Sequence, residues 1–260
     1  MEAGVPQGSA LAPTLYNLYV ADVPKIPGAS LAMFADDTCT FTTYRNPKRA
    51  QKIIQNQLNK LSEYCEKWKI KINPEKTQTI IVKQNRKPDP PQLTLNNTEI
   101  PYSKEVTYLG IQIDNKLTWK KHTQNQTQKA LQLYGKLSCL LNKNSNLSLQ
   151  RKLTIYKQII RPLLLYGCVT FCQAAKTHKK RMDSLQNRIL RIITKAPWYI
   201  RNADIRRDLK IETVPEFIKN RQQKFIEKNT NHQNPLIRET FHYNIERQTG
   251  RIKNIKNPLD

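Results

Sequence analysis

The stretch Leu31-Ala32-Met33-Phe34-Ala35-Asp36-Asp37-Thr38-Cys39-Thr40-Phe41-Thr42 decides the fold of the first part of this chain. A short apolar run, residues 31–35, and a β-prone run, residues 38–42, stand on either side of two adjacent carboxylates. β-Branched and aromatic residues favour strands, and polar residues between two such runs favour a tight turn. The sequence therefore predicts a β-hairpin with Asp36 and Asp37 at its turn.

The two carboxylates have two interpretations. Like charges so close raise one another's pKa unless a cation neutralises them, and hard divalent ions such as Mg²⁺ do so with oxygen ligands. Alternatively, Asp-Asp is simply a good turn dipeptide. Taken alone, the pair favours the plain turn. The surrounding sequence motifs must therefore distinguish a metal site from a plain turn.

The segments around the hairpin have clear signals of their own. Residues 4–9 form a Gly/Pro loop, and residues 11–23 read as a helix with Pro13 in its first turn. Asn46-Pro47 reads as an N-cap followed by proline at the first helical position. Apolar residues then recur at three and four spacing up to Trp68, which predicts an amphipathic helix lying on a sheet.

Strand signals continue to about residue 115 and then give way to helix signals. Residues 77–82 form a β-branched run, and a strand pair is expected near Leu93–Leu95 and Val106–Ile113, joined through the Asn96-Asn97 turn. Further on, four segments rich in Lys, Arg and Gln are expected to be helices: Leu117–Leu141, Leu149–Tyr166, Lys176–Lys195 and Val214–Asn229. We expect a domain boundary near residue 115.

Charge is the dominant feature of the composition. The chain has 44 Lys and Arg against 20 Asp and Glu, a net charge of +24. Such an excess repels itself unless a polyanion neutralises it, and nucleic acid is the polyanion that this pattern favours. An anionic membrane surface or a ribosomal setting is the alternative. The most apolar run, Ile159–Val169, contains Arg161 and Pro162 and is too short to span a bilayer, so no membrane partner is expected.

The cysteines indicate a reduced, intracellular protein. They are five in number, and most lie in apolar surroundings. Cys168 and Cys172 are one helical turn apart, and His178 follows. Zinc would need a fourth ligand that is not apparent nearby, so buried thiols are favoured over a zinc site.

Four short motifs, taken in order, resemble those of reverse transcriptases. They are Pro6-Gln7-Gly8, Phe34-Ala35-Asp36-Asp37, Lys71–Lys76 and Tyr108-Leu109-Gly110, and they resemble the palm motifs B, C, D and E. Within that family they look most like the polymerases of jockey-like non-LTR retrotransposons. Leu163–Gly167 and Leu185–Arg191, followed by Ala196-Pro197, look like the region C-terminal to the polymerase in the same elements.

The resemblance implies an α+β fold and a polymerase activity. It implies a partial palm, an antiparallel sheet with packed helices, over residues 1–115. A helical thumb over 116–170 and a basic helical region with a flexible tail over 171–260 would follow. The activity implied is RNA-directed DNA synthesis, with an RNA template, a DNA primer and deoxynucleoside triphosphates as partners, and with nuclear action. The sequence does not specify an oligomeric state.

The same resemblance implies roles for single residues. Asp36 and Asp37 would bind two Mg²⁺ ions, or Mn²⁺ in their place, about 3.5–4 Å apart. Lys76 would protonate the leaving pyrophosphate, against the alternative of a solvated surface lysine. The residues implied to contact substrate are Pro6, Gln7, Gly8, Phe34, Ala35, Tyr108, Leu109 and Gly110.

The chain departs from the family pattern in one respect. In the family, a further Asp on a strand upstream of the Pro-Gln-Gly loop binds both metals, and only three residues precede Gly4 here. We therefore expect a truncated polymerase that binds primer–template but polymerises weakly or not at all. The alternatives are a non-catalytic basic nucleic-acid-binding protein derived from such an element, and an intron maturase.

Overall fold

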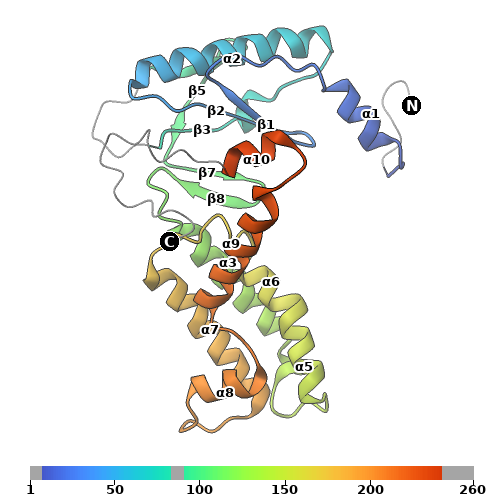
Figure 1. Cartoon of the computed structure of the whole chain (residues 1–260), viewed down its shortest axis with the longest axis vertical. Coiled ribbons are helices and arrows are strands. Elements are labelled where there is room, and N and C mark those ends of the chain that lie inside the picture. Colours follow the sequence, from blue (N-terminus) through green and yellow to red (C-terminus); the bar gives the residue numbers. More distant parts are fainter. Residues whose placement is uncertain (1–7, 83–90, 242–260) are drawn as a thin grey trace. The chain divides into compact units, whose positions relative to one another are not determined.

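The computed structural model describes residues 8–82 and 91–241, with side chains as far as Arg238 (Figure 1). The chain divides into two compact units, Met1–Leu117 and Thr118–Asp260. Short strands and helices make up the first unit, and the described part of the second consists of helices and the loops that join them. This is the mixed α+β composition that the sequence predicts. Pro6 and Gln7 lie outside the described residues.

The predicted hairpin is confirmed, but its turn lies one residue earlier than predicted. Strand β1 (Ser30–Phe34) pairs antiparallel with β2 (Asp37–Phe41), and Phe34 lies opposite Asp37. Ala35 and Asp36 alone therefore form the turn, and Asp37 is the first residue of β2.

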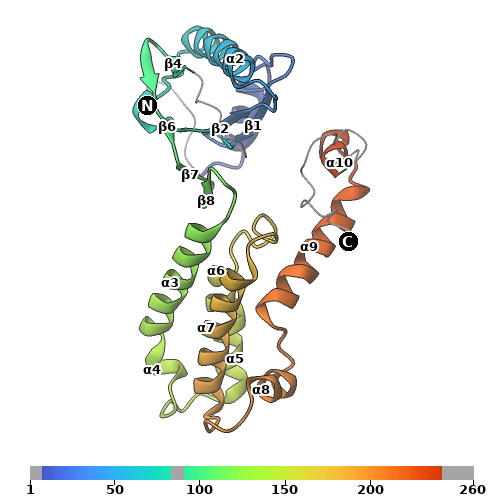
Figure 2. The same ribbon diagram turned by 90° about the vertical axis from the view of Figure 1, so that its left-hand side faces the viewer.

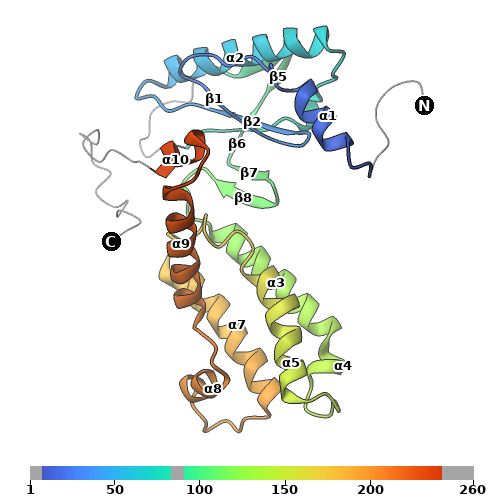
Figure 3. The ribbon, with the colours of Figure 1, turned by 45° about the vertical axis from the view of Figure 1, so that its right-hand side comes forward.

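The predicted amphipathic helix is also confirmed, as α2 (Pro47–Lys67). The Asn46 side chain caps it by accepting a hydrogen bond from the Lys48 N–H at 3.0 Å. Figures 1 and 3 show α2 lying across the strands of the first unit. Its apolar face forms two small cores: Tyr64 and Cys65 pack with residues of the hairpin, and Leu58 packs on Leu93, Leu95 and Ile100.

Buried Gln57 ties α2 to the loop that precedes β1. Its amide nitrogen donates to the Pro24 carbonyl at 2.7 Å, and its amide oxygen accepts from the Ile26 N–H at 2.9 Å. Gln57 is only 1% exposed, so both of its polar ends need these partners. The hairpin is thereby fixed to α2 through its entering loop as well as through its apolar face.

The prediction that Leu93–Leu95 pairs with Val106–Ile113 is wrong. Strand β4 (Leu93–Leu95) pairs with β5 (Thr98–Ile100), and β7 (Glu105–Tyr108) pairs with β8 (Ile111–Asp114). Asn96 and Asn97 have φ values of 49° and 61°, and Leu109 and Gly110 have 48° and 74°. Two successive left-handed residues reverse the chain at once, so each strand pairs with its immediate neighbour.

The remaining strands are shorter than predicted and do not complete one sheet. Strand β3 (Thr79–Ile80) is two residues long and pairs in parallel with β6 (Tyr102–Ser103). The described strands thus form four two-stranded sheets, where the resemblance implied a single antiparallel sheet.

The four predicted helices of the second unit are present, with adjusted ends. They are α3 (Lys120–Lys136) with α4 (Ser138–Leu141); α5 (Leu149–Ile155), η2 (Tyr156–Ile160) and α6 (Arg161–Leu164); α7 (Lys176–Thr194); and α9 (Val214–Thr230). Two more, α8 (Asn202–Leu209) and α10 (Pro235–Phe241), were not predicted; α10 lies in the segment expected to be a flexible tail. Figure 2 shows α3, the α5–α6 segment and α7 lying side by side.

A widened turn interrupts the second of these helices. Residues Tyr156–Ile160 form a π-helical turn, in which the Arg161 N–H reaches back to the Tyr156 carbonyl. Pro162 follows immediately, and proline has no N–H to give to the carbonyl four residues earlier. The helix widens where that hydrogen bond is lost.

One apolar core holds the second unit together. Tyr156, Phe171, Met182, Ile189 and Val214 are each fully buried within it. The core draws on helices from both sides of residue 170. Tyr156 donates to the amide oxygen of buried Gln186 at 2.6 Å, and Gln186 donates to the Glu212 carbonyl at 2.8 Å.

The cysteine pair belongs to this core. Cys168 is buried and Cys172 half-buried, both are free thiols, and burial raises the pKa of each. The favoured interpretation of Cys168 as a buried thiol is confirmed. Within residues 8–82 and 91–241, no three His, Cys, Asp or Glu side chains group where they could hold a metal ion. None of the described helices is both long and apolar enough to cross a membrane.

We predict that the second unit loses stability as pH falls below about 6.5, because of His122. This side chain is 1% exposed, and burial, assisted by the Lys129 charge, lowers its pKa, although the hydrogen bond to the Tyr166 carbonyl acts in the opposite direction. The unfolded chain therefore takes up the proton first, so stability is present above the unfolded pKa and is lost as pH falls. Urea unfolding midpoints between pH 7.5 and 5 measure this slope.

The His122→Gln variant should flatten that pH slope, whatever its effect on absolute stability. His178→Gln is the matched control, because His178 is only half-buried, and it should keep the slope. Equal slopes in the wild-type chain and His122→Gln would contradict the assignment.

Candidate active site

The β1–β2 turn places two carboxylates side by side in solvent. Ala35 has a φ of 49°, in the left-handed region that costs a residue with a side chain about 1–2 kcal/mol. With the chain reversed over only two residues, Asp36 lies within the turn and Asp37 opens the next strand. Both are exposed, as is Phe34 beside them, at 65%.

Helix α1 (Ala12–Tyr19) contacts this turn through a hydrogen bond. The Tyr16 hydroxyl donates to the Ala35 carbonyl at 3.0 Å. None of the residues of α1 is buried, so polar contacts must contribute much of its attachment. The Tyr19 hydroxyl donates to the carbonyl of Trp68 at the end of α2, and the Tyr64 hydroxyl lies 2.8 Å from the Tyr19 carbonyl.

Sequence reasoning missed Tyr16. The available signal was the spacing of Tyr16 and Tyr19, three residues apart and therefore on one face of a helix. Nothing in that spacing indicates that the Tyr16 hydroxyl reaches Ala35, nineteen residues further along the chain.

The charges of the two carboxylates raise the pKa values of two nearby tyrosines. Burial raises the pKa of Tyr16, and the Asp36 charge raises it further. Burial likewise raises the pKa of Tyr108, with contributions from Cys39 and Asp37. The structure thus brings Tyr108, the last residue of β7, close enough to interact with Asp37, as it brings Tyr16 to Asp36.

The other predicted site residues that the structure describes are Lys76, Gly8, Leu109 and Gly110. Lys76 is exposed at the end of the short helix η1 (Pro74–Lys76), whose first turn is capped by the Asn73 side chain. No hydrogen bond or ion pair among the described residues joins Lys76 to Asp36 or Asp37. Gly8 is exposed with a φ of 90°, and an added Cβ there would meet no atom within 4 Å. The Leu109-Gly110 turn caps the β7–β8 hairpin.

The donor set suits a hard divalent cation but is incomplete. Carboxylate oxygens are the ligands that Mg²⁺ prefers, and it usually takes one or two of them together with substrate phosphates and water. Among the described residues, no third His, Cys, Asp or Glu joins the pair. Further ligands would have to come from substrate, from water or from other residues.

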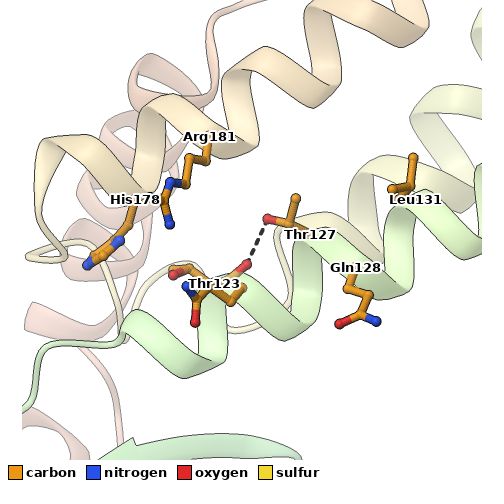
Figure 4. Close-up of a pocket in the computed structure, with 7 residues that line it drawn as sticks. Thr123, Thr127, Gln128, Leu131, His178 and Arg181 are labelled. Carbon is orange, nitrogen blue, oxygen red and sulfur yellow. Dashed lines mark hydrogen bonds between the residues drawn. The ribbon is translucent and has the colours of Figure 1, made fainter.

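Two hollows in the second unit have a different character. One, of about 240 Å³, lies between α3 and α7 and is lined by Thr123, Thr127, His178 and Arg181 among others (Figure 4). The other, of about 380 Å³, is lined by Lys157, Arg161 and Arg221 around Phe217. The guanidinium carbons of the two arginines lie 4.8 and 5.9 Å from the centre of the Phe217 ring. Neither hollow is lined by a carboxylate, so both suit anions better than cations.

Comparison with known proteins identifies the class to which the first unit belongs. Residues 1–113 match the family described as reverse transcriptase (RNA-dependent DNA polymerase). The match covers the β1–β2 hairpin with its carboxylates, the Lys76 turn and the Tyr108 hairpin. No solved structure matches the chain.

Individual relatives extend the match over most of the chain. The RNA-directed DNA polymerase from mobile element jockey of Drosophila melanogaster is 36% identical over 91% of this chain and 26% of that protein. The probable RNA-directed DNA polymerase from transposon X-element of the same organism is 37% identical over 90% of this chain and 26% of that protein. The chain therefore belongs to the reverse transcriptases of jockey-like non-LTR retrotransposons, and it spans about a quarter of the length of these relatives.

We predict that Tyr16→Phe loosens the carboxylate turn. Loss of a hydrogen bond of this kind costs about 0.5–1.5 kcal/mol, so amide hydrogen exchange across the Phe34–Asp37 end of the hairpin should accelerate roughly 2- to 10-fold. Tyr44→Phe is the matched control, since Tyr44 is 39% exposed against 37% for Tyr16 and its hydroxyl does not bond the turn. Identical exchange in the two variants would remove Tyr16 from this role.

Proposed function

We propose that this chain supplies the metal-binding part of the palm, together with the thumb, of an RNA-directed DNA polymerase. The observation that carries the proposal is the exposed Asp36–Asp37 pair, at the turn end of the β1–β2 hairpin, inside the segment that matches the reverse transcriptase family. Its substrates would be an RNA template, a DNA primer and deoxynucleoside triphosphates, with action on chromosomal DNA in the nucleus.

Asp36 and Asp37 would hold Mg²⁺, or Mn²⁺, for nucleotidyl transfer. Bound there, the metal would lower the pKa of the primer hydroxyl and neutralise charge on the leaving pyrophosphate. Transfer of this kind demands positioning and charge neutralisation, so few side chains are required. The chain must hold both carboxylates close together, and the turn at Ala35 with the Tyr16 hydrogen bond would help to keep them there.

Neighbouring segments would position the substrates. Gly8, with Pro6 and Gln7, would lie along the template and the incoming nucleotide, where a missing side chain permits close approach. The Tyr108-Leu109-Gly110 turn would grip the primer end, and the interaction of Tyr108 with Asp37 supports that placement. Phe34 and Ala35 flank the metal site, and exposed Lys76 would donate a proton to the pyrophosphate.

The helical unit would bind the phosphate backbone of the primer–template. We assign the palm to residues 1–115, the thumb to 116–170 and a basic C-terminal region to 171–260. The basic hollow lined by Lys157, Arg161 and Arg221 supports this role, because three cations converge there without a carboxylate in the lining. Phosphate contacts of this kind give salt-dependent affinity without sequence preference.

A second candidate function is nucleic-acid binding without catalysis. It is favoured by the incomplete donor set at Asp36 and Asp37 together with the net charge of +24. Both functions predict salt-sensitive binding of primer–template by the 260-residue chain. They differ in Mg²⁺-dependent nucleotide incorporation, which only the polymerase carries out.

We predict that the 260-residue chain binds primer–template but extends it weakly or not at all. Joined to the remaining polymerase segments of a matched relative, it should extend the primer, and Asp36→Ala should then abolish extension while leaving binding intact. Primer extension on a radiolabelled DNA primer annealed to RNA measures both. Glu63→Gln, which neutralises an exposed carboxylate on α2, is the matched control and should retain activity.

Two outcomes would contradict this account. Robust, Asp36-dependent extension by the 260-residue chain would show that no further ligand is needed. Extension that survives Asp36→Ala in the joined protein would remove Asp36 from the metal site.

A further inference from the structure

The loop that joins α7 to α8, residues 195–201, exposes two large aromatic rings to solvent. Trp198 is 89% exposed, the highest value among the large apolar side chains that the structure describes, and Tyr199 is 67% exposed. Tryptophan is highly buried on average in folded proteins, so such exposure indicates a contact surface. Figure 3 shows this loop at the lower end of α7.

The loop is nevertheless held in one conformation. The Arg191 guanidinium, on α7, donates to the Pro197 carbonyl at 2.5 Å and to the Ile200 carbonyl at 2.6 Å. It also donates to the Asn202 side-chain oxygen at 2.8 Å. One side chain thus spans the loop from its start to its end, so the rings are presented by an ordered backbone.

The backbone at both ends of the loop adds to this order. Lys195 has a φ of 57° and ends α7, and the Ala196 N–H returns to the Arg191 carbonyl at 3.2 Å. Ala196 also packs against the core of the unit. Little further ordering is needed for a ligand to meet the rings, which lowers the entropic cost of binding. Arg191, the last residue of the Leu185–Arg191 motif, and the Ala196-Pro197 motif therefore have a structural role in holding this loop.

The charged side chains in and next to the loop are all positive. The sequence has no acidic residue between Asp183 and Asp204. The basic residues in that interval are Arg188, Arg191, Lys195 and Arg201. Beyond it, Asp204 and Asp208 lie 3.2 and 3.6 Å from Arg207, so their charges are already balanced in part.

The two rings can act as separate platforms. Their centres are 6.0 Å apart and their planes meet at 80°, an edge-to-face arrangement. Each ring keeps a face of its own, and the two are not stacked on one another. An aromatic face in a segment whose charged side chains are all basic matches the two components of a nucleotide, a flat base and a phosphate.

We propose that residues 195–201 bind an unpaired strand of nucleic acid, with bases stacked on Trp198 and Tyr199 and phosphates drawn by the flanking cations. A duplex would not offer free base faces to the rings, because its bases are already stacked on one another. The proposal goes beyond the polymerase function: it involves neither Asp36 nor Asp37, and it stands if that site proves inactive.

Binding of labelled 12-nucleotide single strands, RNA and DNA, by the full 260-residue chain tests the proposal. Fluorescence anisotropy should show that Trp198→Ala with Tyr199→Ala weakens single-strand affinity roughly 10-fold or more, since each stacked base contributes that order of affinity. Affinity for a duplex of the same length should change less than 2-fold. Phe225→Ala, which removes a 45% exposed ring from α9 and leaves the local cations in place, is the matched control and should change neither.

Conservative changes separate stacking from simple apolar contact. Trp198→Phe keeps a ring and should retain most of the affinity, whereas Trp198→Leu keeps an apolar side chain without a ring and should lose it. Arg191→Ala keeps both rings but frees the loop, and it should also weaken binding. The chain has three tryptophans, so quenching of tryptophan fluorescence by the single strand should be largest when Trp198 is present.

Three results would overturn the proposal. The first is single-strand affinity that is unchanged by the double alanine variant. The second is an equal loss for single strand and duplex, which indicates a loss of general charge contact. The third is full affinity in Trp198→Leu, which would assign the rings to an apolar protein partner. Circular dichroism of each variant confirms that the helical unit is intact.

Discussion

The candidate site depends on one backbone constraint, the left-handed conformation of Ala35. Because the chain reverses within two residues, both aspartates lie at the exposed end of the hairpin, outside the apolar core. A longer turn would separate them, and a one-residue shift in pairing would place Asp37 on the opposite face. The conformation is costly for alanine, and the Tyr16 hydrogen bond to its carbonyl, with the packing of β1 and β2 against α2, offsets that cost.

The second constraint is charge. A chain with a net charge of +24 repels itself, and the described ion pairs of the helical unit are few and partly exposed. The apolar core around Tyr156 and Ile189 must therefore hold the helices together while the surface stays cationic. A polyanion relieves this strain wherever it binds. We propose two such binding places in the helical unit: the basic hollow at Arg161 for phosphates, and the aromatic loop at Trp198 for bases.

Local signals were predictable from the sequence, and long-range contacts were not. The hairpin at Asp36 and the helix opened by Asn46 both follow from neighbouring residues, and both are confirmed. The prediction of one strand over Val106–Ile113 failed because Leu109 reverses the chain within that run, in a left-handed conformation that leucine rarely adopts. The partner of β4 could have been predicted, since asparagine tolerates the left-handed conformation and the Asn96-Asn97 turn pairs β4 with the residues that follow at once. Helices α8 and α10 are short, eight and seven residues, and give little periodic pattern. The role of Tyr16 depends on a contact across the fold, which spacing alone does not reveal.

The central claim is that Asp36 and Asp37 together bind a divalent metal. Titrating the isotope-labelled chain with Mn²⁺, a paramagnetic substitute for Mg²⁺, tests it without any requirement for catalysis. The account predicts that the amide signals of residues 35–38 broaden first, that Tyr108 follows, and that Asp36→Asn with Asp37→Asn removes the effect. Broadening that begins elsewhere in the chain, or that persists in the double variant, would contradict the account.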